Sequence, residues 1–165
     1  MPGGPLHASS GSNPPGSTVA SDAELLEAYR RTIWLVETPA GPLQVSLDRA
    51  PDPQLQPSGI ITAYNPASIR GSEEDNRAAD QELLRHVRSL GVPFRRSLAQ
   101  GGRASDPAWD EPGFVLLGDV RPLLVELGLV FGQNAVVWID GSGAASLVCT
   151  RSGFAGRRPG QKIDL

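Results

Sequence analysis

The sequence predicts an α+β domain in which helices pack on one face of a mainly antiparallel sheet. Two observations predict this class. From residue 58 onward, extended and helical patterns alternate in the order β-α-β-β-α-β, which is typical of a ferredoxin-like core. Two extended runs precede that core and one follows it, so we expect a β-hairpin before the core and an additional strand after it.

Composition divides the chain into a domain and two tails. Of its 165 residues, 39% are apolar and 20% are charged, a balance typical of a soluble globular protein. Residues 1–20 are nearly all Pro, Gly, Ser, Asn and other small residues, so we expect a disordered tail. Residues 151–165 place basic side chains among glycines, so we expect a flexible basic tail there. A single domain therefore spans residues 21–150.

Charge and cysteine content exclude several classes of partner. The formal net charge of −3 gives no general attraction to nucleic acid, and the basic tail alone would bind phosphates only weakly. The single cysteine, Cys149, cannot form an internal disulfide and is typical of a reducing compartment. No apolar run has the length of a signal peptide core or a membrane span. We therefore expect a soluble cytoplasmic protein without membrane or nucleic-acid partners.

The first elements are a short helix and a hairpin. Ser21 and Glu24 have the spacing of a capping box, and an apolar stripe that ends at Tyr29 predicts a helix of two to three turns. Residues 32–37 and 43–47 are rich in β-forming side chains and flank a turn that contains proline and glycine. We interpret these two runs as a β-hairpin.

The ferredoxin-like core begins with a strand and the main helix. Residues 58–64 predict the strand, and the hydroxyl of Ser72 predicts the start of a helix that ends at Gly91. Asn76 falls on the apolar face of that helix and therefore points inward, toward the end of the strand. Residues 94–100 alternate weakly, as expected of an edge strand.

The second half of the core repeats the pattern. Residues 114–117 are apolar on both faces and predict a central strand, and Pro122 marks the start of a second helix. Gln133 and Asn134 end that helix and lead into the strand predicted for residues 135–139. A turn then leads to a last strand, which begins at Ser146.

Polar side chains gather where the strand over residues 58–64 ends. In the ferredoxin-like order this strand and the strand after Asn134 are antiparallel, so their polar ends meet at one end of the sheet. The candidate ligand-binding residues are Tyr64, Asn65, Ser68, Asn76, Arg77, Gln133 and Asn134. Amide and hydroxyl groups suit a planar or hydroxylated ligand, and a guanidinium suits an anionic group. Alternatively, these residues cap turns and helix ends and only stabilise the fold.

Glu111 is a secondary candidate. In the predicted topology it lies at the opposite end of the sheet from Asn65, so we expect a solvated carboxylate there, unless the topology differs and Glu111 joins the cluster. No histidine is placed to activate Ser68 or Cys149, and no His, Cys or carboxylate group has metal-ligand spacing. We therefore predict no metal and no cofactor, and we assign no catalytic residue; enzymatic activity stays open.

Separated blocks of sequence, in order, resemble a known family. The blocks are Ile61-Thr62-Ala63-Tyr64-Asn65-Pro66-x-Ser68, Asn76, Glu111-x-x-Phe114 and Phe131-Gly132-Gln133-Asn134-Ala135-Val136-Val137. Between Tyr29 and Ile139 the chain resembles the bacterial family catalogued as domain of unknown function 3293. This resemblance implies a small bacterial cytoplasmic domain, and it supplies no activity, cofactor or catalytic residue.

Two functions of different classes fit these observations. In the first, the chain binds a small polar or nucleotide-like ligand at the polar cluster. In the alternative, it is a protein-interaction or regulatory module without catalytic activity, and the sheet contacts a protein partner or a second copy of the chain. A concave pocket at the cluster would favour the first function, and an exposed apolar patch without a pocket would favour the second.

Overall fold

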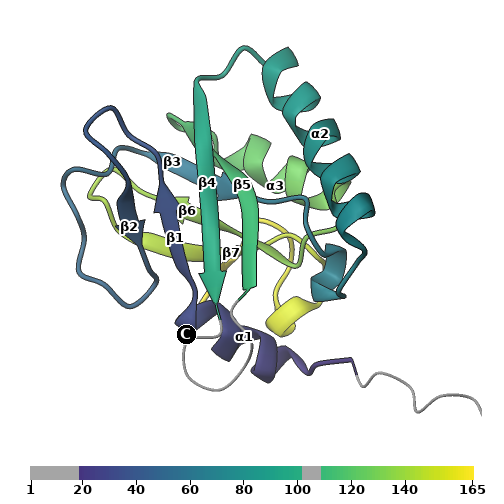
Figure 1. The fold of residues 1–165 in the computed structure, drawn as a ribbon. Helices are drawn as coiled ribbons and strands as arrows, with labels where there is room; N and C mark the ends of the chain where they lie inside the picture. Colours follow the sequence, from purple (N-terminus) through teal and green to yellow (C-terminus); the bar gives the residue numbers. More distant parts are fainter. Residues whose placement is uncertain (1–18, 102–108) are drawn as a thin grey trace, which may run out of the picture.

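The computed structural model describes residues 19–101 and 109–165 (Figure 1). In these residues, eight strands form one curled antiparallel sheet with the spatial order β2-β1-β4-β5-β3-β6-β7-β8. The strands are β1 (Ile33–Val36), β2 (Leu43–Val45), β3 (Ser58–Ile61), β4 (Phe94–Gly101), β5 (Trp109–Leu117), β6 (Ala135–Ile139), β7 (Ala145–Cys149) and β8 (Lys162–Ile163). The helices are α1 (Asp22–Arg31), α2 (Glu73–Ser89) and α3 (Arg121–Val130), and two short 3₁₀ turns are η1 (Pro66–Ser68) and η2 (Phe154–Gly156).

The predicted α+β class with an antiparallel sheet is confirmed. The ferredoxin-like order of strands is not confirmed, because the sheet has eight strands. The hairpin expected before the core is present as β1 and β2, which pair antiparallel. The prediction of an edge strand at residues 94–100 is wrong, because β4 lies between β1 and β5. A weak alternation of apolar and polar residues does not show whether a strand lies at the free edge of a sheet or is covered there by a further hairpin.

The two faces of the sheet carry separate apolar clusters. Ile60 and Ile61 are neighbours on β3 and belong to different clusters, because successive side chains of a strand point to opposite faces. Leu83 of α2 and Leu124 of α3 are fully buried against the face of Ile61. The first helix, α1, packs against the other cluster through a stripe that ends at Tyr29. The prediction that the helices share one face is therefore wrong for α1.

Local signals account for the helix ends. Glu24 N donates to Ser21 Oγ at 3.2 Å and Ser21 N donates to a Glu24 carboxylate oxygen at 2.7 Å, so the predicted capping box is present. Ser72 Oγ caps α2 by accepting from the backbone N–H of Asp75 at 3.0 Å, and Gly91 follows that helix with a φ of +67°. Within the part of the chain that the structure describes, no helix combines the length and the apolar character needed to cross a membrane.

The C-terminal residues differ from the flexible tail that the sequence predicts. Phe154 is fully buried, and Ile163 is buried on β8, which pairs with β7. Large apolar side chains are few among the polar and glycine residues of this segment, so its average composition conceals the two that are buried. Residues 1–18, which contain most of the predicted N-terminal tail, lie outside the described residues.

Candidate functional site

The chain turns sharply after β3, and we call residues 62–72 the β3 corner. The strand ends where Thr62 Oγ1 donates to the carbonyl oxygen of Pro112 at 2.8 Å. Asn65, Ala67 and Ser68 then adopt left-handed backbone conformations, with φ values of 48°, 55° and 60°. This conformation costs a residue with a side chain roughly 1–2 kcal/mol. Three such residues within a few positions mark a strained corner that its surroundings have to hold.

A pair of asparagines fixes the β3 corner to α2. The backbone N–H of Asn65 donates to Asn76 Oδ1 at 2.9 Å, and Asn76 Nδ2 donates to Asn65 Oδ1 at 3.0 Å. The same Asn65 oxygen accepts a bond from the backbone N–H of Gly71 at 3.0 Å. Asn76 is buried and points inward from α2, as its position on the helix predicts. Both lone pairs of Asn65 Oδ1 are therefore used within the fold.

Glu111 joins this corner, so the prediction that it lies at the opposite end of the sheet is wrong. Asn65 Nδ2 donates to Glu111 Oε1 at 2.6 Å. The strands β3 and β5 are antiparallel neighbours, with Ile61 opposite Phe114. The end of β3 consequently lies beside the start of β5, and Glu111 precedes Phe114 on that strand by three residues.

The negative charge of the Glu111 carboxylate is only partly offset by hydrogen bonding from the described residues. Its side chain is half-buried, and burial raises its pKa, while the hydrogen bond from Asn65 opposes that rise. Among residues 19–101 and 109–165, no ion pair includes Glu111 and Asn65 is its one side-chain donor. No fully buried side-chain nitrogen or oxygen of these residues lacks a partner. Oxygen Oε2 of Glu111 has no hydrogen-bond partner among the described residues.

Tyr29 of α1 brings a phenol to the same place. Burial raises the pKa of Tyr29 to about 12, the charge of Glu111 acts in the same direction, and a hydrogen bond with Ser68 and the charge of Arg151 oppose the rise. The phenol therefore stays protonated at neutral pH and can both donate and accept. The sequence placed Tyr29 in an apolar stripe. Its hydroxyl group was the one signal that it could also contribute to a polar site.

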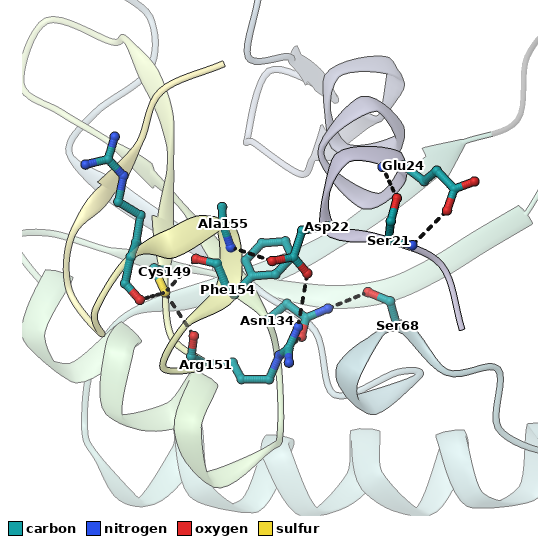
Figure 2. A network of polar contacts seen from close by, with 10 residues as sticks. Ser21, Asp22, Glu24, Ser68, Asn134, Cys149, Arg151, Phe154 and Ala155 are labelled. Atoms are coloured by element: carbon teal, nitrogen blue, oxygen red, sulfur yellow. Dashed lines mark hydrogen bonds and ion pairs between the residues drawn. The ribbon is translucent and has the colours of Figure 1, made fainter. Parts of the chain in front are cut away.

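A row of polar contacts connects η1 to α1 through the C-terminal segment, as Figure 2 shows. Asn134 Nδ2 donates to Ser68 Oγ at 2.9 Å, and Arg151 Nε donates to Asn134 Oδ1 at 2.6 Å. Arg151 also lies 3.6 Å from the carboxylate of Asp22, which accepts a bond from the backbone N–H of Ala155 at 2.9 Å. Sequence reasoning missed Asp22 and Arg151, because they come from a helix start and a supposed tail.

The remaining candidates have structural partners. Gln133 Nε2 donates to the carbonyl oxygen of Tyr64 at 3.2 Å, so Gln133 supports the backbone just before the corner. The hydroxyl of Tyr64 lies 3.4 Å from a carboxylate oxygen of Glu73 on α2. Arg77 pairs with that same oxygen at 3.0 Å on the exposed side of the helix. Arg77 therefore reaches the corner only through Glu73, whose carboxylate oxygen it shares with the hydroxyl of Tyr64.

Other features of the surface do not coincide with this cluster. Two open depressions, of about 390 and 260 Å³, lie elsewhere, one beside Arg49 and one beside Lys162. Among the described residues, no three His, Cys, Asp or Glu side chains gather as ligands for a metal ion. The groups gathered around Ser68 include the Glu111 carboxylate, the hydroxyls of Tyr29 and Ser68 and the guanidinium of Arg151, and the corner also contains the exposed Arg70.

Comparison with known families gives a match over part of the chain. Residues 61–136 match the family model described as "Protein of unknown function (DUF3293)". This match supports the resemblance to that family that the sequence indicates. The DUF3293 match begins at the end of β3 and ends in β6, so it contains Asn65, Asn76 and Glu111 but neither Tyr29 nor Arg151. No curated protein and no solved structure matches the chain.

Proposed function

We propose that this chain is a small-molecule binding domain and that the ligand binds at the β3 corner through Glu111, Tyr29 and Ser68. The observation that carries the proposal is the half-buried Glu111 carboxylate, which has one amide donor and no ion pair within the described residues. Removing a charge from water without a cationic partner is unfavourable. Carboxylates perturbed in this way are found chiefly at functional sites.

The amide side chains of the corner have a supporting role in this proposal. Asn65, Asn76 and Asn134 already use their side-chain groups within the fold, and Gln133 holds a backbone carbonyl. These residues position Ser68 and Glu111 rather than contact the ligand. A site is effective when such supporting bonds fix the groups that bind.

The strained backbone of η1 supports the same conclusion. Its left-handed residues place Ser68 Oγ beside the phenol of Tyr29 and within reach of Asn134 Nδ2. Strain of this kind persists only where the surrounding structure overdetermines the conformation, and it is concentrated at binding and active sites.

The test is a binding screen on matched variants. Purified chain is screened by thermal shift against amines, amino acids, nucleosides, nucleotides and sugar phosphates, and each hit is measured by titration calorimetry. A ligand at 100 times its Kd raises stability by about 2.7 kcal/mol. The variants are Glu111→Gln and Ser68→Ala, and the control is Asp110→Asn, which removes the exposed neighbouring carboxylate.

We expect the hit to be lost in Glu111→Gln, weakened in Ser68→Ala and kept in Asp110→Asn. A hit that binds Glu111→Gln as tightly as the parent chain would show that the ligand binds elsewhere and would overturn the proposal.

Protein interaction is the second candidate, favoured by exposed apolar side chains beside the corner and by the two open depressions, which lie away from the corner. Ile69, Leu129 and Val130 are 58%, 50% and 67% exposed. They flank the point where the backbone N–H of Ala67 donates to the carbonyl oxygen of Gly132 at 2.8 Å. Self-association through this patch predicts a dimer in analytical ultracentrifugation that Val130→Asp dissociates. A monomer at all concentrations would exclude self-association.

We further propose that β4, β5, β3 and β6, with α2 and α3, correspond to the ferredoxin-like core expected from the sequence. Their contiguous place in the sheet order supports this assignment. In that case β3 and β6 with their helices would fold first, and hydrogen exchange would be slowest in β3.

A further inference from the structure

The Glu111 carboxylate has no ion pair among the described residues. Its charge and that of Arg151 both act on the phenol of Tyr29, and the guanidinium of Arg151 also lies beside the carboxylate of Asp22. That guanidinium is already engaged, since its Nε donates to Asn134 Oδ1 at 2.6 Å and its Nη2 lies 3.6 Å from Asp22. Arg151 is therefore not available to Glu111, and the exposed Arg70 of the corner forms no ion pair with Glu111 either.

The free hydrogen-bonding groups are mainly acceptors. Oε2 of Glu111 has no donor among the described residues, and the hydroxyl oxygens of Tyr29 and Ser68 each have acceptor capacity. An ammonium or a guanidinium group is a donor only, so it complements such a set of oxygens. A phosphate or carboxylate would instead meet the like charge of Glu111, and the guanidinium of Arg77 is paired with Glu73 on the exposed side of α2.

We infer that the ligand of the β3 corner carries a positively charged nitrogen group, either a primary ammonium or a guanidinium, and that this group binds the Glu111 carboxylate between the hydroxyls of Tyr29 and Ser68. The inference rests on the proposed small-molecule function and specifies its ligand class. It replaces the anionic group that the sequence suggested for Arg77 with a cationic group at Glu111.

The test compares cations with neutral molecules of the same shape. Titration calorimetry on the full chain uses two matched pairs, putrescine with 1,4-butanediol and L-arginine with L-citrulline, together with inorganic phosphate and AMP. Hydrogen bonds to a charged group are about twice as strong as neutral ones, so we expect a cation to bind at least about tenfold more tightly than its neutral counterpart. Glu111→Gln should remove that preference, and Asp110→Asn should retain it.

The outcomes separate the two proposals. A neutral compound or an anion that binds the parent as tightly as its cationic counterpart, and is weakened by Ser68→Ala, would overturn the cation inference and leave the binding function standing. Failure of every compound to bind the parent would overturn both. The comparison within each pair uses the parent chain alone, so it does not depend on whether Glu111→Gln folds. Circular dichroism establishes the fold of each variant before its result is used.

Discussion

The turns η1 and η2 have the same backbone shape but are held in different ways. Each follows a left-handed residue, Asn65 with a φ of 48° and Gly153 with a φ of 84°. Each also contains a left-handed alanine, Ala67 at 55° and Ala155 at 51°. The turn η2 buries Phe154 completely, whereas η1 buries none of its residues.

The difference between the turns is the kind of interaction that balances their strain. An apolar anchor such as Phe154 gains free energy from area removed from water, and that gain does not depend on direction. The asparagine contacts of η1 do depend on direction, because each hydrogen bond needs its donor and acceptor aligned. The anchored turn therefore serves the stability of the fold, and the turn held by amides serves the placement of polar groups.

The largest effect is expected at the anchored turn. Phe154→Ala removes a fully buried ring and leaves a cavity, so we expect the free energy of unfolding to fall by about 3–5 kcal/mol. Urea denaturation followed by circular dichroism measures the change. A loss below about 1 kcal/mol would mean that η2 is held by its backbone bonds alone and would remove the contrast with η1.

An intermediate effect is expected at the turn held by amides. Asn65→Ala and Asn76→Ala each leave a polar partner unpaired, so each should lower the free energy of unfolding by about 1–3 kcal/mol. The double variant should lose less than the sum, with a coupling of about 0.5–3 kcal/mol. Urea denaturation of the four chains gives the coupling. Additive losses would show that the two side chains act independently.

The smallest effect is expected from glycine in the two left-handed positions. Ala67→Gly and Ala155→Gly relieve backbone strain but give the unfolded chain more freedom, so each should stabilise by less than about 1 kcal/mol. The matched control is Ala78→Gly in α2, where glycine should lower stability by about 1 kcal/mol. Differential scanning calorimetry compares the melting temperatures of the three variants. If Ala67→Gly destabilised as much as the control, the strain assigned to η1 would be refuted.

Signals that act over a few residues were predictable from the sequence. The capping box at Ser21, the cap at Ser72 and the glycine at residue 91 all use partners within one helical turn. The gathering of Asn65, Ser68, Asn76 and Asn134 was also predictable, because only the order of strands around β3 was needed.

Features that depend on distant pairing were not predictable. The place of Glu111 required the pairing and direction of β5: it is an antiparallel neighbour of β3, so its start lies beside the end of β3, and no signal within a few residues shows that pairing. Tyr29 and Arg151 reach the corner from a helix and from the C-terminal segment, outside the predicted core. Arg77 was assigned to the site by proximity in sequence, but its charge is paired with Glu73 one helical turn away.

The spatial order of the sheet has a consequence for aggregation. Its two outer strands, β2 and β8, contain three and two residues. Exposed strand edges recruit further chains into continuous sheets, and very short outer strands are one means by which proteins prevent this. Lys162 on β8 adds a charge that opposes such growth. A macromolecular partner of this domain would therefore approach a helix, a sheet face or the β3 corner rather than extend the sheet.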